Sequence, residues 1–236
     1  MTKNDHFQEI YQQKAAQYHQ MIEVEDVDSH LLAALQRITD FRGKFVLDLG
    51  SGTGRIPLLL QSLDVRMACL DLQRAMLLEQ KNQRAKVGGN WGMVQGDMRV
   101  LPLADNCADV VIAGWAIGHL CSWFEDSWQD EIARILCEMH RTARCGGVLV
   151  ILETMTTGSL FPAPPTPELA RYYAFLEGEW GFEREVIQTD YQFCDVQDAV
   201  ARTEFFFGSD LSEKIRQHGW ARLPEWTGVW SKRLTN

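Results

Sequence analysis

The fold of this chain is decided by residues 46–54, Val-Leu-Asp-Leu-Gly-Ser-Gly-Thr-Gly. An apolar run of strand character ends there at three glycines in alternate positions, Gly50, Gly52 and Gly54. Glycine accepts positive φ and lets a ligand approach bare backbone, so this loop suits a bound cofactor. The spacing is G-x-G-x-G, and Arg55 stands where a dinucleotide fingerprint has its last glycine.

Acidic residues accompany the tips of three successive strand patterns. Asp48 precedes the first glycine, and Asp71 ends the next apolar run, where an acidic side chain can bind ribose hydroxyls. Asp97 and Met98 follow a short strand pattern at residues 91–95. A carboxylate there can accept a hydrogen bond from the exocyclic amine of adenine, while the apolar side chain lies beside the ring. The order of loop, ribose acid and adenine acid predicts a nucleoside-containing cofactor.

Strand and helix patterns alternate from residue 43 to residue 152, which predicts βαβ units and a parallel sheet. We expect a doubly wound α/β fold of seven strands with helices on both faces. The sixth strand is expected at 185–193 and the seventh at 222–233, separated by two helices within 195–218 that break at Gly208.

The constellation of loop and acids resembles the class I S-adenosylmethionine-dependent methyltransferases, and the resemblance covers most of the chain. Asp48 and the three glycines match the family's first motif, Asp71 its ribose-binding acid, and Asp97-Met98 its adenine-binding pair. The strand pattern at 109–114 matches the family's fourth strand, and 146–151 matches its fifth.

Within that family the chain looks most like the small-molecule branch. The fourth strand leads into residues 114–117, Gly-Trp-Ala-Ile, in place of the Asn/Asp-Pro-Pro-Tyr signature of many amino-directed enzymes. The resemblance implies a Rossmann-like seven-stranded sheet with an antiparallel edge. It implies S-adenosylmethionine as methyl donor, S-adenosylhomocysteine as product and a small-molecule acceptor.

The expected cofactor-binding residues lie in the glycine loop, at the strand tips and in the first helix. They are Asp48, Gly50, Ser51, Gly52, Thr53, Gly54, Asp71, Leu72, Asp97, Met98, Trp115, Tyr11 and Tyr18. Asp48 can also act by orienting the loop without touching the ligand, and Asp71 and Asp97 have alternative readings as helix-capping or turn residues. Tyr11 and Tyr18 form a lid in this interpretation, although their spacing equally suits plain helix packing.

Two residues are candidates for catalysis. His119 follows the fourth strand, where its imidazole can accept a proton from an acceptor hydroxyl, amine or thiol. Many methyltransferases need no base, because alignment of an already activated methyl group supplies much of the rate, so a structural or substrate-contacting role is the alternative. Glu153 ends the fifth strand and is expected to act as base or substrate anchor, or to cap backbone donors of the neighbouring loop.

Four parts of the chain are expected: a helical cap element at 1–42, the cofactor-binding core at 43–153, a cap and substrate region at 154–218, and a final strand at 219–236. A single helix is expected over residues 3–22, and Ser29 is expected to cap a second helix through Asp40. The proline-rich connection at 154–167 leaves the fifth strand at the sheet edge where ligands bind in open α/β folds.

The two cap regions are expected to enclose the acceptor. Residues 7–22 would bound one side of the cavity and residues 158–207 the other. Trp115, which can stack on a ligand, His119 and Glu153 are expected to open into this one cavity.

Composition limits the cellular setting and the binding partners that are expected for this protein. A net charge of −9 argues against a large phosphate-tracking surface, so no nucleic-acid partner is expected. No membrane span or apolar signal core is visible in the sequence. The six cysteines include no C-x-x-C pair, and no metal site is expected. These features favour a reducing, cytoplasmic setting.

Two other classes of function fit parts of the pattern. An NAD-dependent oxidoreductase shares the strand, glycine loop and helix, but Arg55 and the Asp97-Met98 pair count against it. A non-catalytic protein that binds S-adenosylmethionine or S-adenosylhomocysteine would carry the same motifs. The sequence specifies neither the acceptor, nor the methylated atom, nor the oligomeric state.

Overall fold

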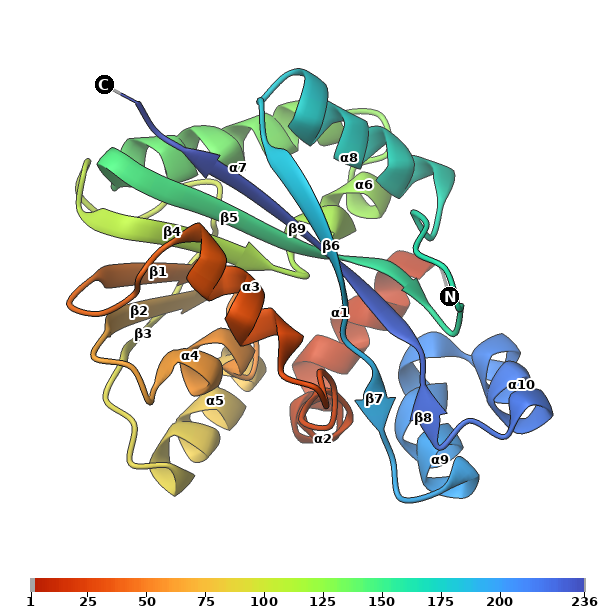
Figure 1. The fold of residues 1–236 in the computed structure, drawn as a ribbon. Helices are drawn as coiled ribbons and strands as arrows, with labels where there is room; N and C mark the ends of the chain where they lie inside the picture. Colours follow the sequence, from red (N-terminus) through yellow and green to blue (C-terminus); the bar gives the residue numbers. More distant parts are fainter. Residues whose placement is uncertain (1–2, 236) are drawn as a thin grey trace.

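A seven-stranded sheet forms the centre of the protein (Figure 1), whose computed structural model describes residues 3–235 and the side chains from residue 6 onward. In spatial order its strands are β3 (Gly92–Gln95), β2 (Arg66–Asp71), β1 (Phe45–Leu49), β4 (Ala108–Gly114), β5 (Ala143–Thr157), β9 (Glu225–Arg233) and β6 (Glu183–Gln188). The first five are parallel, and β9 runs antiparallel to both β5 and β6. The predicted doubly wound fold with an antiparallel edge is confirmed.

Helices cover both faces of this sheet (Figure 1). They are α1 (Lys3–Gln13), α2 (Ala15–Ile22), α3 (His30–Ile38), α4 (Arg55–Leu60), α5 (Arg74–Lys86), α6 (Leu120–Trp123), α7 (Trp128–Thr142), α8 (Pro167–Gly178), α9 (Val196–Phe207) and α10 (Ser209–His218), with a 3-10 turn η1 (Ile117–His119) before α6. Two successive residues of β1 point to opposite faces: Leu47 packs with α6, α7 and α8, whereas Val46 packs with α3 and α4. Because both faces are buried, the central strands are almost continuously apolar, and each fully buried aliphatic side chain contributes about 1.5–3 kcal/mol.

The sixth and seventh strands are each split, which corrects the prediction of two continuous strands at 185–193 and 222–233. The additional short strands are β7 (Tyr191–Gln192) and β8 (Arg222–Leu223), which pair with each other in a separate two-stranded sheet. Pro224 lacks an N–H for a ladder, so a break falls between β8 and β9. Asp190 separates β6 from β7, and its carboxylate accepts a hydrogen bond from the Glu225 N–H at 3.1 Å.

The amino-terminal helices also differ from the prediction. The single helix expected at 3–22 is interrupted at Lys14 into α1 and α2. Ser29 adopts a left-handed φ of 58° and makes no capping bond. Asp26 caps α3 instead, because its two carboxylate oxygens accept the His30 and Leu31 N–H groups at 2.8 and 3.0 Å.

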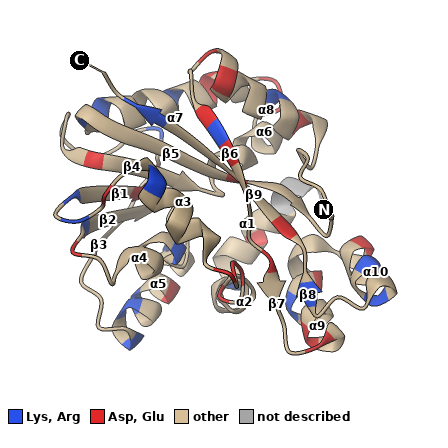
Figure 2. Ribbon diagram, viewed as in Figure 1, with Lys and Arg blue, Asp and Glu red and all other residues tan. Residues whose placement is uncertain are grey.

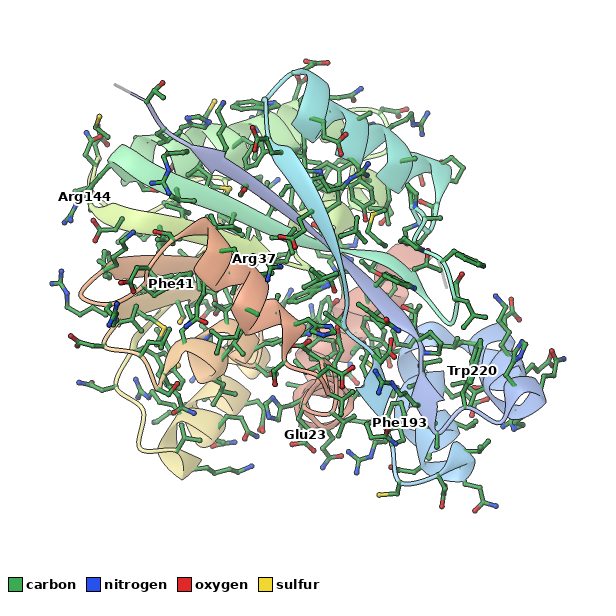
Figure 3. The ribbon with its side chains drawn as sticks, in the orientation of Figure 1. Glu23, Arg37, Phe41, Arg144, Phe193 and Trp220 are labelled. Atoms are coloured by element: carbon green, nitrogen blue, oxygen red, sulfur yellow. The ribbon has the colours of Figure 1, made fainter. Side chains whose placement is uncertain are left out.

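The elements from the two predicted cap regions pack on each other beyond the carboxyl ends of the parallel strands (Figure 1). An apolar cluster joins α2, α9 and α10 to the small sheet, and it includes Met21, Phe193 and Ile215, with Trp220 packed against it (Figure 3). The break between α9 and α10 falls at Gly208 as predicted. The division of the chain into four parts remains a prediction.

Charges of both signs share the outer helices, as Figure 2 shows for α5, α9 and α10. Some form ion pairs along one helix, such as Arg202 with Asp198 at 2.9 Å. Such exposed pairs contribute little to stability and neutralise charge locally. No helix in the described part of the chain is long and apolar enough to cross a membrane.

We expect Asp26→Ala to lower the free energy of unfolding by about 1–2 kcal/mol, because it removes the acceptor for two N–H groups at the start of α3. Ser29→Ala is the matched control and should change it by less than about 0.5 kcal/mol. Urea denaturation of the two variants measures both values. Equal losses, or a larger loss for Ser29→Ala, would contradict this assignment of the cap.

Candidate cofactor and acceptor site

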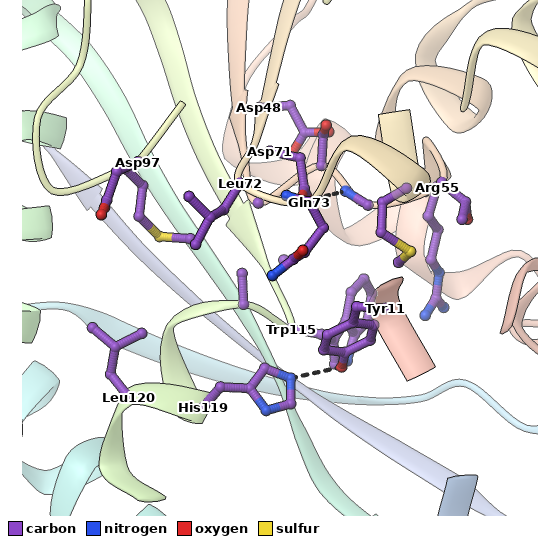
Figure 4. A pocket seen from close by; sticks show the side chains of 18 of the residues that line it. Tyr11, Asp48, Arg55, Asp71, Leu72, Gln73, Asp97, Trp115, His119 and Leu120 are labelled. Carbon is purple, nitrogen blue, oxygen red and sulfur yellow. Dashed lines mark hydrogen bonds between the residues drawn. The ribbon is translucent and has the colours of Figure 1, made fainter. Parts of the chain in front are cut away.

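A cavity of about 290 Å³ lies at the carboxyl ends of β1, β2 and β4 (Figure 4). It brings together the glycine loop, the strand tips, η1 and the helices α1 and α2. The predicted site residues that line it are Tyr11, Tyr18, Asp48, Gly50, Ser51, Gly52, Thr53, Asp71, Leu72, Asp97, Met98, Trp115 and His119. Gly54 and Glu153 are not among the described residues that line it.

The glycine loop has the conformation that its spacing predicts. Gly50, Gly52 and Gly54 have φ values of 66°, 54° and 96°, all in the left-handed region. A Cβ atom on Gly50 would lie 2.4 Å from the Cβ atom of Ala116, so only glycine fits there. Gly54 packs toward α5, where its Cβ atom would meet Gln80 at 2.8 Å, which explains why it lies outside the cavity lining.

Asp71 connects the glycine loop to the tip of β2. Its Oδ2 accepts the Gly52 N–H and its Oδ1 accepts the Gln73 N–H, both at 2.7 Å. The side chain is buried, and burial raises the pKa of its carboxyl above the usual value. Each oxygen retains a lone pair, so the carboxylate can still accept hydroxyl groups from a ligand.

Asp48 is buried beside the loop, and its Oδ2 has no hydrogen-bond partner among the described residues. Burial and the neighbouring Asp71 raise the pKa of this carboxyl well above its usual value. An unpaired buried oxygen is costly, so a hydrogen-bond donor on a ligand would be favourable here.

Asp97 is held by an arginine that the sequence analysis missed. Arg99 donates to Asp97 through Nε and Nη2, the latter at 2.6 Å, and to Glu131 through Nη1 at 2.6 Å. These hydrogen bonds hold the pKa of Asp97 below its usual value, so the carboxylate stays charged. The Arg99 guanidinium also lies over the Phe124 ring at 5.2 Å.

His119 faces Tyr11 across the cavity. The Tyr11 hydroxyl lies 2.8 Å from His119 Nε2 (Figure 4). The imidazole stacks on the Trp123 ring, with 5.2 Å between ring centres. Burial lowers the pKa of His119 to about 4 and raises the pKa of Tyr11 well above its usual value. Both groups are therefore neutral at pH 7, and the imidazole retains the ability to accept a proton.

Trp115 is held in an unusual conformation next to a buried ion pair. Its φ of 51° is left-handed, and its N–H donates to the Leu152 carbonyl at 2.7 Å. The Arg55 guanidinium lies 3.9 Å from the centre of the Trp115 ring and donates through Nη1 to Glu25 at 2.8 Å. Arg55 was visible in the sequence only as a departure from the dinucleotide fingerprint.

The expectation that Glu153 faces the cavity is wrong. Its buried carboxyl accepts the Gly118 N–H at 2.8 Å and the Tyr172 hydroxyl at 3.5 Å, so it caps the η1 turn that carries His119. Burial raises the pKa of this carboxyl to about 8.

The expectation that residues 158–207 bound one side of the cavity is also wrong, because no described residue of this segment lines it. Its contribution is indirect: Phe206 of α9 packs behind Phe7 and Tyr18, at 5.1 and 5.5 Å between ring centres.

Several lining residues were not predicted as site residues. They are Gln8, Ile22, Arg55, Ile56, Gln73, Met76, Arg99, Gly114, Ala116, Leu120, Trp123, Phe124 and Ile135. For most of them the only sequence signal was proximity to a predicted residue, as for Gln73 after Asp71 and Leu120 after His119.

The geometry shows an α/β protein with a cavity at the carboxyl ends of its parallel strands, and comparison with known proteins adds to this picture. Residues 47–151 match the family model described as "Methyltransferase domain". The malonyl-[acyl-carrier protein] O-methyltransferase of Pectobacterium atrosepticum is 30% identical over 181 residues, or 75% of this chain and 63% of that protein. The demethylmenaquinone methyltransferase of Thermobifida fusca is 26% identical over 199 residues, or 81% and 75%.

Solved structures share the fold at low sequence identity. YcgJ from Bacillus subtilis superposes with a TM-score of 0.60 at 15% identity, covering 88% of this chain and 99% of that one. A phosphoethanolamine N-methyltransferase 2 from Haemonchus contortus gives 0.63 at 14% identity, covering 100% and 61%. Residues 47–151 are thus similar to the methyltransferase domain, and the chain shares the fold of solved S-adenosylmethionine-dependent methyltransferases. It spans less than two thirds of the length of the malonyl-[acyl-carrier protein] O-methyltransferases with which it aligns.

We expect Glu153→Gln to make stability less dependent on pH. The folded state raises the pKa of this carboxyl from 4.5 to about 8, so its contribution to stability is fully present below pH 4.5 and is lost as the pH rises to 8. Relative to the unchanged protein, the variant should therefore gain stability between pH 5 and pH 8. Urea denaturation at both pH values measures this gain, with exposed Glu213→Gln as the control. A difference that does not vary with pH would contradict it.

Proposed function

We propose that this protein transfers a methyl group from S-adenosylmethionine to a small-molecule acceptor and releases S-adenosylhomocysteine. The observation that carries the proposal is one cavity lined by the glycine loop, Asp71 and Asp97 together with the neutral pair His119 and Tyr11. The match of residues 47–151 to the methyltransferase domain and the names of the relatives support the same reaction class.

The residues present fit this cofactor. Asp71 has lone pairs for the ribose hydroxyls, and Asp97 and Met98 offer an acceptor and an apolar contact for adenine. The unpartnered Oδ2 of Asp48 suits the ammonium of the methionine portion beside Gly50. The cofactor, when bound, supplies a methyl group already activated by the sulfonium.

The chain contributes alignment, exclusion of water and a proton acceptor. The half-buried rings of Tyr11, Trp115 and Trp123 enclose the acceptor end of the cavity, which favours an apolar or planar acceptor. His119 is neutral and can take a proton from an acceptor hydroxyl or ring carbon, but an acceptor carboxylate would have no proton to lose. The relatives' names, malonyl-[acyl-carrier protein] O-methyltransferase and demethylmenaquinone methyltransferase, provide examples of both chemistries.

Measurements of ligand binding and of turnover distinguish the competing functions. A nicotinamide enzyme would bind NAD, whereas a non-catalytic binding protein would bind S-adenosylmethionine without forming S-adenosylhomocysteine with any acceptor. Mass spectrometry of reactions with a malonyl thioester or a demethylated naphthoquinol should detect S-adenosylhomocysteine above the level without acceptor. The absence of turnover across acids, phenols, amines and thiols would favour the non-catalytic alternative.

We expect the protein to bind S-adenosylhomocysteine with micromolar affinity in calorimetric titration and NAD weakly or not at all. Asp71→Ala should weaken binding of S-adenosylhomocysteine by roughly 1.5–3 kcal/mol, because charge-assisted hydrogen bonds to the ribose are lost. Exposed Asp64→Ala is the charge control, and thermal melting checks that the variants fold. Micromolar binding of NAD with no response to either adenosyl ligand would contradict the proposal.

We expect His119→Ala to slow methyl transfer without weakening binding of S-adenosylhomocysteine. A loss of ~10²-fold or more in kcat would identify His119 as a general base, and a smaller loss would indicate a positioning role. With a pKa of about 4, His119 stays neutral from pH 6 to 8, so its contribution should be constant over that range. If affinity falls while kcat is unchanged, neither catalytic role holds.

A further inference from the structure

Two arginines line the cavity in the described part of the chain, and their partners differ. Three nitrogens of Arg99 donate to the carboxylates of Asp97 and Glu131. Arg55 donates to Glu25 through Nη1, but its Nη2 is enclosed and has no hydrogen-bond partner among the described residues. Arg55 thus retains an unused donor group that Arg99 lacks.

The surroundings of Arg55 make this unused group informative. Its side chain is 16% exposed, and that of Glu25 only 3%. The Trp115 ring lies against its face at 3.9 Å, so the guanidinium is held in place and shielded from water. A charged donor left unpaired in such a place is costly, and a ligand oxygen would remove that cost.

The other groups at this end of the cavity carry no charge that could attract an anion. Burial keeps Tyr11 and Tyr18 protonated and His119 neutral. Arg55 is therefore the cation that a ligand carboxylate would meet there, since a planar guanidinium matches a carboxylate in shape and charge.

We propose that Arg55 binds a carboxylate of a ligand in this cavity. The inference rests on the proposed function and has two possible sources: the methionine carboxylate of the cofactor, or a carboxylate on the acceptor. Glu25 opposes binding in this scheme, because it shares the guanidinium and neutralises its charge. Removing the Glu25 charge should therefore strengthen carboxylate binding, whereas removing Arg55 should weaken it.

Calorimetric titration with paired probes tests the proposal. S-adenosylhomocysteine carries the amino-acid carboxylate, and 5′-methylthioadenosine lacks it. Malonate and its neutral diamide, added to protein saturated with S-adenosylhomocysteine, test the acceptor side. The variants are Arg55→Gln and Glu25→Gln, with exposed Arg66→Gln as the charge control. Arg55→Gln leaves Glu25 buried without its cationic partner and could destabilise the fold. The double variant Glu25→Gln/Arg55→Gln, whose folding is checked by thermal melting, therefore repeats the test without an unpaired buried charge.

If the cofactor supplies the carboxylate, Arg55→Gln and the double variant should weaken S-adenosylhomocysteine binding by about 10- to 100-fold and leave 5′-methylthioadenosine unchanged. If the acceptor supplies it, both adenosyl ligands should bind as before while malonate binding is lost and the diamide is unaffected. In either case Glu25→Gln should bind the carboxylate probe more tightly.

A merely structural ion pair predicts a different result. Arg55→Gln and Glu25→Gln would then weaken all probes alike, or none of them, and either outcome would overturn the proposal. Failure of the proposed function is a separate result, because the unchanged protein would then bind neither S-adenosylhomocysteine nor 5′-methylthioadenosine.

Discussion

The pair of hydrogen bonds from the Gly52 and Gln73 N–H groups to Asp71 is the constraint on which the site depends. Through it, the loop after β1 and the turn after β2 share one carboxylate, and this shared acceptor shapes the floor of the cavity. Burying the carboxylate is unfavourable, and the two backbone donors offset that cost. A side chain at Gly50 would collide with Ala116, so the same loop also requires glycine where it passes the end of β4.

The amino-terminal helices complete the site from the other side. His19 of α2 lies 2.9 Å from the Thr53 hydroxyl, and Tyr11 of α1 lies 2.8 Å from His119. The chain between α2 and α3 adds Glu25, which pairs with Arg55. Polar contacts therefore join α1, α2 and the segment after them to η1, to the glycine loop and to α4. The helices are a wall of the cavity, and α9 supports that wall from behind through Phe206.

Local patterns predicted the sheet and the cofactor end of the site, because one buried strand, one glycine loop and one acid each leave a signal in a few neighbouring residues. Contacts between segments that are distant in the sequence leave no such signal in neighbouring residues. Glu25 looked like part of a solvated acidic loop, yet it is buried against Arg55. Glu153 looked like a cavity residue, but its direction was set by Gly118, whose N–H it accepts. Asp26 replaced Ser29 as a cap because it offers two oxygens to two donors.

The most direct test of the account is a crystal structure of the protein with S-adenosylhomocysteine. The account predicts ribose hydroxyls within hydrogen-bond distance of Asp71, the adenine amine at Asp97 with its ring beside Met98, and the methionine portion over Gly50 and Asp48. It also predicts that the sulfur faces the end of the cavity that holds Tyr11 and His119. An adenosyl group bound elsewhere, or one whose ribose makes no contact with Asp71, would contradict it.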